Sequence, residues 1–541
     1  MQRLQDRYWA GDRLGGPLRI ERHYDGRSMR CFSERPATIP AMFATLLERL
    51  PDRPAIVEDR RLSYCELHEL VESIAAGLAR YGISAGDRVV LFLGNRWQFL
   101  ATVLACTRIG AVAVPIGTRQ RANELEFMIN DCAAKIVIHE AELADEIPPA
   151  ASIATVTHLF AIGGEAPGSQ PFDALLVGPD TAPAAPPASE EDAAVILYTS
   201  GTTGRPKGAI LTHLSIIHSS LTFARCHGLT EEDRCIVAVP LSHVTGLVGV
   251  SFATMIVGGC VVLMRQAYKT PDFLALAARE RITYSILVPA IYTLCALYPD
   301  LDQHDLSQWR IGCFGGAPMP VPTIEMLARR LPHLLLLNAY GATETTSPTT
   351  CMPRGCWREN MDSVGQVVPC GEVVVRDETG KPVPPGTPGE LWIAGPMVVP
   401  GYFNRPEANA NEFVDGFWRS GDIGSVDAEG FVRIFDRRKD MINRGGYKVY
   451  SAEVENILTG LEGVQECAVI GIPDPVLGER VHVFVKPRDN ALLTPDTVRS
   501  YCGERMADYK VPETVTFLSD PLPRNANGKI QKAVLRAMDR G

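Results

Sequence analysis

The sequence predicts an α/β protein with a large N-terminal domain of mainly parallel sheets flanked by helices, a β-rich subdomain and a small α+β C-terminal domain. Three observations predict this fold. From about residue 41, short apolar runs alternate with longer segments whose apolar residues recur at helical spacing. From about residue 365, short strands and turns follow one another. Beyond about residue 436, helical segments lie among strands again, and we expect a separate compact unit there.

The elements of the first region alternate as they do in parallel sheets whose strands are joined by crossover helices. The sequence predicts helices over 42–50, 66–81, 97–109 and 122–132, and strands over 55–57, 61–64, 88–93, 111–116 and 135–139. Residues 163–188 are rich in Pro, Ala and Gly, which predicts an irregular crossing loop. Further strands are predicted over 193–197, 236–240, 260–264, 284–288, 310–314 and 334–338, with helices between them.

The later elements are shorter and follow a different order. Strands over 372–375, 389–394 and 431–434 make up the expected β-rich subdomain. The C-terminal unit is predicted to contain helices over 452–458 and 495–506, and strands over 464–470, 481–486 and 514–518. We place a boundary at about 436–440, so that the predicted domains are residues 1–436 and 437–541.

Composition is ordinary for a globular enzyme and excludes several classes of protein. The net charge of −10 argues against nucleic acid as a partner, because the chain has no global basic field. No run reaches the roughly 18 apolar residues of a membrane span. Residues 1–36 are interspersed with acidic side chains and lack an apolar signal region, which predicts a cytoplasmic protein. The 14 cysteines are scattered singly, which predicts reduced, mostly buried thiols without a disulfide framework or a zinc site.

The segment 198–208 is the strongest candidate for a binding loop. It follows the apolar run 193–197 and contains three glycines, four Ser or Thr hydroxyls and two cations. Such residues cannot pack a core, but glycines let a backbone approach a ligand, and N–H groups, hydroxyls and a lysine bind phosphate. The plain alternative is a polar turn between two strands. The register of a P-loop NTPase fails, because Arg205 follows Gly204 and Gly208 follows Lys207.

The segment 199–208 instead resembles the signature Ser/Thr-Gly-Thr-Thr-Gly-x-Pro-Lys-Gly of the adenylate-forming superfamily at every fixed position. That superfamily contains the acyl-CoA synthetases of the AMP-dependent synthetase and ligase family, the adenylation domains of peptide synthetases, and firefly luciferase. Five further segments resemble it in the same chain order. The resemblance implies that ATP and AMP are bound by Thr199, Ser200, Gly201, Thr202, Thr203, Gly204 and Lys207.

Two segments that follow predicted strands, 314–318 and 338–346, resemble the nucleotide site of the family. Glycines at the end of a strand let a flat ring approach the backbone, although they also suit a plain strand-to-helix turn. The resemblance assigns to the nucleotide Gly316, Ala317, Pro318, Asn338, Ala339, Tyr340, Gly341 and Thr343. It implies that Glu344, with Thr199, holds Mg²⁺, a hard cation that prefers oxygen ligands. Alone, a Thr-Glu pair is typical of a helix cap.

The segment 240–246 resembles the loop whose histidine borders the acyl pocket of the family. The implied pocket residues are His243, Val244, Gly246, Val248, Gly315 and Gly341. Without this context, a histidine in such a loop is more often structural. Many relatives have an aromatic residue where this chain has Ser242. The pocket segments 244–251 and 313–318 are small and apolar and carry no cation, which favours a fatty or aryl acid over a dicarboxylate.

The C-terminal third of the chain carries the remaining matches. Asp422 resembles the ribose-binding carboxylate, and Arg437 its partner for ribose or phosphate. The other implied residues are Lys439 at the hinge, Gly445, Gly446 and Tyr447 in the loop of the thioester step, and the catalytic lysine, Lys529. The plain alternatives are a turn aspartate, a charged linker and a surface lysine. The resemblance also implies that the C-terminal domain is mobile and rotates between two reaction steps.

These matches predict an ATP-dependent, AMP-forming acyl-CoA ligase that uses ATP, Mg²⁺ and CoA. The implied catalytic residues are Lys529, Glu344, Thr199 and His243. A glycine stands at position 445, where luciferase has the lysine of its oxidative step, which disfavours a luciferase. The alternatives are a ligase that loads a carrier protein, an NTP hydrolase or switch, and a nucleotide-binding protein without catalysis. A carrier protein or a second copy of the chain is left open as a partner.

Overall fold

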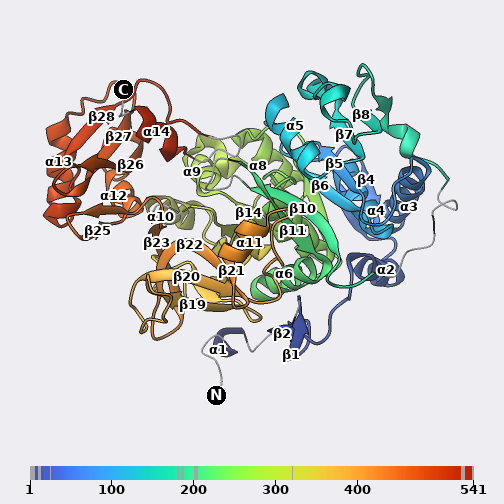
Figure 1. Ribbon diagram of the computed structural model, residues 1–541, viewed down its shortest axis with the longest axis horizontal. Coiled ribbons are helices and arrows are strands. Elements are labelled where there is room, and N and C mark those ends of the chain that lie inside the picture. The colour runs from blue at the N-terminus through green and yellow to red at the C-terminus, as the bar shows by residue number, and fades with distance from the viewer. Residues whose placement is uncertain are drawn as a thin grey trace. The chain divides into compact units, whose positions relative to one another are not determined.

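The computed structural model describes residues 6–9, 14–24, 26–178, 183, 188–199, 205–317, 319, 321–524 and 530–538 (Figure 1). The chain forms two compact units. Unit 1 comprises residues Met1–Val373, Ile393–Arg419 and Glu429–Val432. Unit 2 comprises residues Val374–Trp392, Ser420–Ala428 and Arg433–Gly541. The chain thus enters unit 2 for the last time at Arg433, and the boundary predicted at 436–440 stays a prediction.

The first sheet of unit 1 has seven strands in the order β11-β10-β6-β5-β7-β8-β9. Their bounds are β5 Arg88–Phe92, β6 Val112–Pro115, β7 Ile136–Glu140, β8 His158–Ile162, β9 Gln170–Pro171, β10 Ala193–Thr199 and β11 Lys207–Thr212. All neighbours are parallel except β10 and β11, which are antiparallel. The helices are α3 Tyr64–Arg80, α4 Trp97–Arg108 and α5 Ala122–Asp131, with the 3₁₀ turns η1 Ala141–Glu146, η2 Ala150–Ser152 and η3 Phe172–Leu175.

Alternate residues of these strands point to opposite faces of the sheet, and both faces are covered. Val89 and Leu91 of β5 pack in one cluster with α3 and α4, whereas Val90 and Phe92 pack in another with α5. Figure 1 shows α3 and α4 on one side of the sheet and α5 on the other. The central strands are therefore continuous apolar runs, which is why they were predictable from the sequence.

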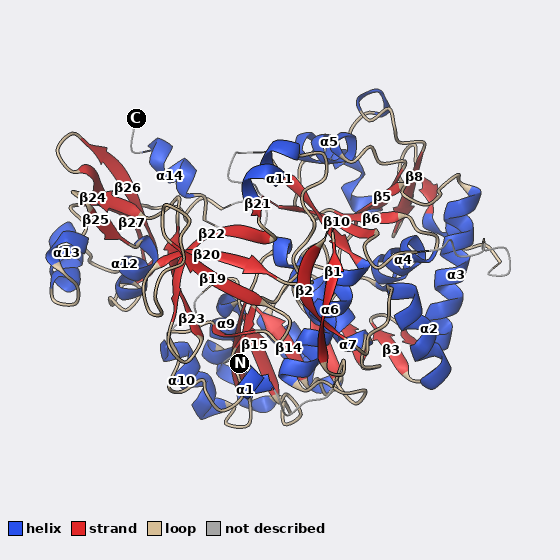
Figure 2. Cartoon of the chain, turned by 60° about the horizontal axis from the view of Figure 1, so that its bottom comes forward, coloured by secondary structure: helices blue, strands red, loops and turns tan. Residues whose placement is uncertain are grey.

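The second sheet of unit 1 runs in the order β18-β17-β16-β15-β14-β12-β13-β3-β4. Its strands are β3 Pro54–Val57, β4 Arg61–Ser63, β12 Arg234–Val237, β13 Cys260–Leu263, β14 Tyr284–Leu287, β15 Ile311–Phe314, β16 Leu335–Tyr340, β17 Thr350–Cys351 and β18 Gly365–Val367. The six strands β16, β15, β14, β12, β13 and β3, which are neighbours in this order, are parallel to one another. Strands β4, β17 and β18 are antiparallel to their neighbours. Figure 2 shows β14 and β15 side by side in this sheet.

Helices cover both faces of this second sheet as well. Helices α8 Thr270–Arg279, α9 Pro289–Leu297 and α10 Val321–Arg330 share a hydrophobic cluster on one face. Helix α6 His213–His227, the π-helix η5 Thr245–Phe252 and α7 Ala253–Met255 share a cluster on the other. This unit also contains α1 Asp6–Trp9, α2 Ile39–Arg49, η6 Pro299–Gln303, η7 Thr343–Thr345, α11 Pro406–Glu412 and β21 Phe413–Val414.

Unit 2 is built around a five-stranded sheet in the order β25-β24-β27-β26, with β28 beside β27. Figure 2 labels β24 to β27 of this sheet. The strands are β24 Ile442–Arg444, β25 Tyr447–Val449, β26 Val464–Asp474, β27 Gly478–Pro487 and β28 Thr514–Phe517. Helices α12 Ser451–Leu458 and α13 Pro495–Gly503 pack on one face, and α14 Lys532–Met538 packs on the other. The unit also holds parts of the ladder β19-β20-β22-β23, whose strands are Glu372–Arg376, Gly389–Ala394, Phe417–Val426 and Phe431–Arg437. A 3₁₀ turn, η8 Asp508–Lys510, completes it.

The predicted helices and strands are confirmed to within a few residues, and the differences have local causes. Tyr64, predicted to end a strand, begins α3, because Ser63 caps that helix and exchanges two hydrogen bonds with Glu66. Strands β26 and β27 extend beyond their predicted ends because their pairing continues to Asp474 and Gly478. The predicted crossing loop contains the short β9 and η3. The π-helix η5 was not predicted.

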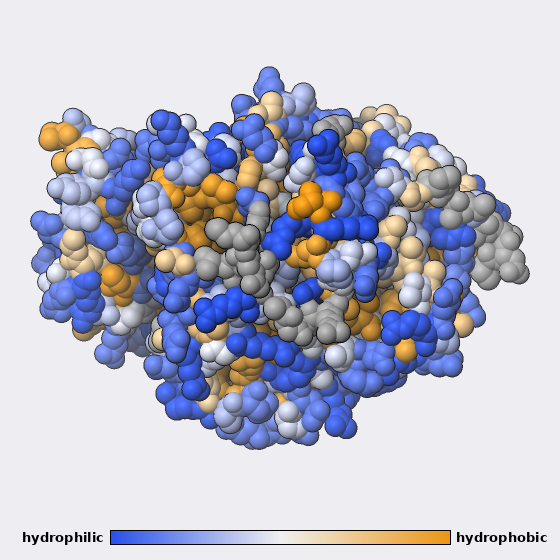
Figure 3. Space-filling view, turned by 90° about the horizontal axis from the view of Figure 1, so that it is seen from below, coloured by the Kyte–Doolittle hydropathy of each residue, from blue (hydrophilic) through white to orange (hydrophobic). Residues whose placement is uncertain are grey.

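The cysteines lie mostly in the interior of the protein. All 14 cysteines are free thiols, and all except Cys65 and Cys356 are buried, as the sequence predicted. Burial raises the pKa of Cys106 and Cys132 to about 12. The face in Figure 3 is mainly hydrophilic, with hydrophobic residues in separate patches. No helix in the described part of the chain is long and apolar enough to cross a membrane.

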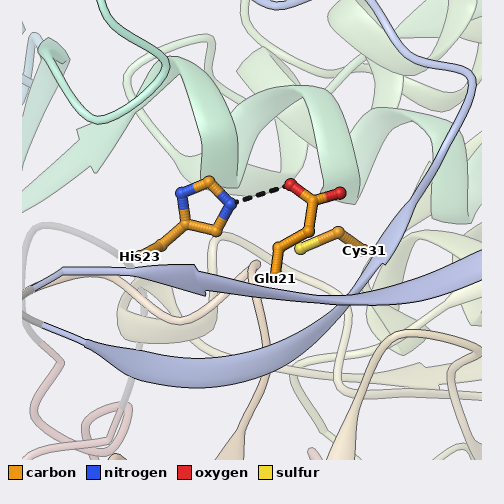
Figure 4. Close-up of side chains that lie close together, drawn as sticks. All are labelled: Glu21, His23 and Cys31. Carbon is orange, nitrogen blue, oxygen red and sulfur yellow. Dashed lines mark hydrogen bonds and ion pairs between the residues drawn. The ribbon is translucent and has the colours of Figure 1, made fainter.

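The N-terminal hairpin of β1 Leu18–His23 and β2 Arg27–Phe32 brings Glu21, His23 and Cys31 together (Figure 4). Their ligand atoms lie within 4.8 Å of one another. However, Arg35 donates to both oxygens of Glu21 at 2.9 and 2.7 Å, which lowers the pKa of Glu21 and places a fixed cation beside it. Burial raises the pKa of Cys31 to about 12, so in the absence of a cation its sulfur keeps its proton. The cluster is therefore an ion-paired anchor for the hairpin.

The ion pair between Arg35 and Glu21 should contribute to the free energy of unfolding. The side chains of Arg35 and Glu21 are 4% and 16% exposed, so Arg35→Ala should lower the free energy of unfolding by about 2–4 kcal/mol in urea denaturation. Arg19 also pairs with Glu21, at 2.6 Å, but it is 60% exposed, and Arg19→Ala should cost less than about 1 kcal/mol.

The pKa of Glu21 is lowered on folding, so its contribution is present above the ordinary value of 4.5 and is lost as the pH falls below it. The difference between the native protein and Arg35→Ala should therefore shrink below that pH. Equal losses for the two arginine variants would contradict this role of Arg35.

Candidate functional site

The loop predicted to bind phosphate is held at both ends by a β-ladder. Strands β10 and β11 pair so that Thr199 lies opposite Lys207. The Thr199 hydroxyl donates to the carbonyl oxygen of Lys207 across a distance of 3.5 Å. The loop therefore leaves and rejoins the sheet at neighbouring positions. Its predicted ligands Ser200, Gly201, Thr202, Thr203 and Gly204 lie outside the described residues.

Lys207 has partners that the sequence motifs did not indicate. Its side chain is 9% exposed, and its Nζ lies 2.6 Å from Oε1 of Glu412. The same nitrogen lies 4.2 Å from the ring centroid of Tyr402, which is a cation–π distance. Tyr402 comes within reach because the segment 401–403 runs beside β11, where Phe403 N donates to the carbonyl oxygen of Gly208 at 2.8 Å.

The Tyr402 hydroxyl connects this lysine to the predicted metal ligand. It lies 2.9 Å from Oε1 of Glu344 and 2.8 Å from Oε2 of Glu412. Burial, followed by the charges of the two glutamates, raises the pKa of Tyr402, so the hydroxyl keeps its proton. A hydroxyl has one proton and can donate to only one of the two carboxylates at a time. Lys207, Tyr402, Glu344 and Glu412 thus form one network.

Glu344 is suited to bind a hard cation. It is buried in η7, and its backbone oxygen accepts a hydrogen bond from Val399 N at 2.9 Å, which fixes the turn. Tyr402 bonds one carboxylate oxygen, and within the described ranges no hydrogen bond is made to the other oxygen. A carboxylate is an oxygen ligand of the kind that Mg²⁺ prefers, so Glu344 fits the predicted metal role.

The other predicted nucleotide residues lie at one edge of the second sheet. Strands β15 and β16 are parallel neighbours with Phe314 opposite Asn338, so the turns that follow them share the carboxyl edge where α/β sheets bind ligands. Asn338 Nδ2 donates to the backbone oxygen of Ser363 at 3.2 Å. The structure therefore brings together Gly315, Gly316, Ala317, Asn338, Ala339, Tyr340, Gly341 and Thr343. Pro318 lies outside the described residues.

A close backbone contact explains one glycine of this edge, and a positive φ explains another. A Cβ atom at Gly315 would lie 2.4 Å from the carbonyl oxygen of Ala339, so only glycine fits there. Gly316 has a φ of +78° and open space around it, which suits a turn that faces a ligand. Ala339 is buried, whereas Gly316 and Ala317 are exposed.

The predicted acyl-pocket segment forms the start of η5. His243 is half-buried, and its backbone oxygen accepts from Leu247 N at 3.0 Å. Val244 and Val248 are buried. A Cβ at Gly246 would lie 2.4 Å from the carbonyl oxygen of Pro240, so this glycine permits close backbone packing. The segment is therefore buried from Gly246 onward, and its role as the acyl pocket stays a prediction.

Asp422 and Arg437, predicted to act together on the ribose, are direct partners within unit 2. Asp422 Oδ1 lies 2.6 Å from Nε of Arg437. The carboxylate is buried, and Ser420 Oγ accepts from the Asp422 backbone N at 3.0 Å. The arginine side chain is 48% exposed. The pair is thus a buried carboxylate held by a half-exposed arginine, and its role at the ribose stays a prediction.

The predicted hinge segment is anchored within unit 2 on one side of Lys439. The carboxylate of Asp436 is buried and accepts hydrogen bonds from the backbone N of Arg437 and from Ser451, and burial raises its pKa. Lys439 itself is exposed. Its backbone oxygen accepts from Arg536 at 3.3 Å.

The loop predicted for the thioester step is a tight hairpin turn. Gly445 and Gly446 connect β24 to β25 with φ values of +57° and +88°, and two such residues are the requirement of a type I′ turn. Tyr447 is 58% exposed and stacks on Tyr509 with ring centroids 4.6 Å apart. Lys529, the predicted catalytic lysine, lies outside the described residues.

A large hollow lies away from all these motifs, at the amino ends of β12, β14 and β15. Its volume is about 740 Å³, and it is lined by charged residues that include Arg234, Arg310, Asp233 and Glu280. The buried carboxylates of Asp233 and Glu280 each pair with an arginine at 2.7 Å. Since parallel sheets bind ligands at the opposite edge, we assign this hollow to the ion pairs of the fold.

Comparison with known proteins shows matches along nearly the whole chain. The family model of the AMP-binding enzyme matches residues 43–403, and that of the AMP-binding enzyme C-terminal domain matches residues 453–529. A feruloyl-CoA synthase from Amycolatopsis sp is 37% identical over 476 residues, which cover 88% of this chain and 93% of that protein.

Two further relatives show the same extent of similarity. The long-chain-fatty-acid–CoA ligase FadD13 of Mycobacterium tuberculosis is 35% identical over 500 residues, which cover 91% of this chain and 96% of that protein. A crystal structure of the anthranilate CoA ligase AuaEII in complex with anthranoyl-AMP superposes with a TM-score of 0.85 at 26% identity, and covers 93% of this chain and 97% of that chain.

The glycine turn between β24 and β25 can be tested by stability. Gly446→Ala should lower the free energy of unfolding by about 1–2 kcal/mol, because an L-residue is strained at this positive φ. Gly503→Ala, at the end of α13 with no atom near its Cβ, is the matched control and should be neutral or slightly stabilising. If urea unfolding gives the same stability for both variants, the turn does not depend on glycine.

Proposed function

Since this chain belongs to the AMP-binding enzyme family and is an AMP-forming acyl-CoA ligase, we propose that the acid it activates is hydrophobic, either aryl or fatty. Two kinds of observation support this acid class. Residues 244–252 are small or apolar without a cation, and they are buried from Gly246 onward. The relatives named above act on feruloyl and long-chain fatty acyl groups.

The reaction has two steps in which different bonds break. The substrate carboxylate is already ionised at pH 7, so it attacks the α-phosphorus of ATP without a general base, and pyrophosphate leaves. The thiol of CoA then attacks the acyl carbon of the adenylate, and AMP leaves with the phosphate oxygen. Both steps depend on positioning and on neutralising charge more than on covalent help from the protein.

The convergence of Lys207, Tyr402 and Glu344 at the base of the phosphate loop carries the proposed placement of ATP. In this proposal Lys207 binds the phosphates that leave as pyrophosphate. Glu344, with Thr199, would hold Mg²⁺, which when bound offsets part of the polyphosphate charge. The turns after β15 and β16 bind the adenine ring, and Asp422 with Arg437 binds the ribose.

The roles of the C-terminal residues rest on the family resemblance. Lys529 would bridge the substrate carboxylate and the α-phosphate in the first step, and rotation about Lys439 would bring Gly445, Gly446 and Tyr447 to CoA for the second. His243 would border the acid. A carrier-protein thiol as acceptor, a homodimer and a cytoplasmic location stay predictions. An NTP hydrolase is disfavoured, because the register of a P-loop fails at Arg205 and Gly208. Release of phosphate in place of pyrophosphate would favour it.

The acid class can be tested by measuring pyrophosphate release with a panel of acids. Cinnamic-type acids or medium- and long-chain fatty acids should react at least about tenfold faster than malonate, which corresponds to about 1.4 kcal/mol. Product analysis should show acyl-CoA only when CoA is added. Malonate as the best substrate would refute a hydrophobic acid, and acyl-AMP that does not react with CoA would favour a carrier protein.

The division of labour between the steps can be tested with Lys529→Ala. Removing this lysine should slow pyrophosphate release by at least about 100-fold, because an electrostatic contact to the reacting oxygens is lost. Thioester formation from a supplied acyl-adenylate should keep most of its rate. Lys381→Ala, which removes an exposed lysine of the same unit, should leave both steps unchanged. Equal loss of both steps would refute the assignment.

A further inference from the structure

Lys207 is neutralised by a residue that lies 205 positions later in the chain. We propose that Glu412 is a positioning residue that holds the Lys207 ammonium group in the nucleotide-free enzyme and competes with the phosphates of ATP for it. This inference rests on the proposed function, in which Lys207 binds the polyphosphate. It adds a residue that none of the sequence motifs includes.

The position of Glu412 is set by the start of its helix. Asn409, in α11, bonds both backbone groups of Tyr402: its Oδ1 accepts from Tyr402 N at 2.7 Å, and its Nδ2 donates to Tyr402 O at 2.9 Å. Gly401 leaves room for this side chain, because a Cβ there would lie 2.9 Å from it. Glu412 follows three residues later on the same face of the helix, and therefore meets the Tyr402 hydroxyl and Lys207.

The exposure of the Lys207 and Glu412 side chains favours an exchange in which Lys207 leaves the Glu412 carboxylate and binds phosphate. The Lys207 side chain is 9% exposed and stays over the Tyr402 ring, whereas that of Glu412 is 31% exposed and can turn to solvent. ATP brings several negative charges to the loop that Lys207 closes. A carboxylate that remained at 2.6 Å from the lysine would repel them, so Glu412 must give up the ammonium group when the phosphates bind.

Tyr402 keeps the same position in this proposal whether Lys207 binds Glu412 or phosphate. Its ring stays against the lysine Nζ whichever anion binds it, and its hydroxyl lies between the carboxylates of Glu344 and Glu412. When Glu412 turns away, the single hydroxyl proton remains available to Glu344. Release of Lys207 therefore leaves the carboxylate proposed for Mg²⁺ in place.

The test compares Glu412→Gln with Glu407→Gln, which removes the same charge from an exposed position of the same helix. Titration calorimetry with Mg²⁺ and ATP, without acid, measures the Kd, and pyrophosphate release measures KM and kcat. Glu412→Gln should lower both the Kd and the KM for ATP about fivefold, because the competing anion is gone, while kcat changes less than about twofold. Glu407→Gln should match the native enzyme.

A purely structural role of Glu412 would give the opposite sign, since a damaged site binds ATP more weakly. An unchanged or higher Kd in Glu412→Gln would therefore overturn the proposal. Glu412→Ala should shift the Kd in the same direction as Glu412→Gln, so the test does not depend on one variant folding. The variant Lys207→Met distinguishes a failure of the proposed function from a failure of this inference. If Lys207→Met binds ATP as tightly as the native enzyme, Lys207 does not bind the phosphates. If it binds weakly while both Glu412 variants are unchanged, only the competition by Glu412 is refuted.

Discussion

The antiparallel pairing of β10 with β11 is the interaction on which the candidate site depends, because the loop between them cannot pack a core of its own. Strand β10 is held on its other side by the parallel strand β6, inside the buried sheet. Strand β11 is held on its other side by the segment 401–403. The two strands that flank the loop are thus held by segments from other parts of the chain. The composition of the loop can serve ligand binding because stability is supplied by these neighbours.

The contact of β11 with the segment 401–403 brings together charges that are far apart in sequence. By placing Tyr402 beside β11, it sets one phenol between two carboxylates and one lysine against its ring. Such a group has fewer protons than acceptors and one cation for two anions. It is therefore suited to receive a further cation.

Much of the fold could be predicted from the sequence, because buried parallel strands are continuous apolar runs and their helices have a polar side. The π-helix η5 escaped prediction since its residues from Gly246 to Phe252 are all buried, which leaves no polar face to reveal a period. A shared role of Asp422 and Arg437 at the ribose was predicted from motifs, whereas their direct ion pair was not. Tyr402 and Glu412 lie outside the segments identified in the sequence and meet Lys207 only through tertiary structure. The assignments on Ser200–Gly204, Pro318 and Lys529 stay predictions of the sequence.

The burial of the cysteines has a consequence for an enzyme whose second substrate is itself a thiol. CoA can form mixed disulfides with any protein sulfur that is accessible and ionised. Here burial raises the pKa of thiols such as Cys106, Cys132 and Cys295 to about 11 or 12, and it also keeps them from contact with solvent. The protein can therefore work in a high concentration of CoA, or of its oxidised disulfide, without becoming covalently linked to its own substrate through these residues.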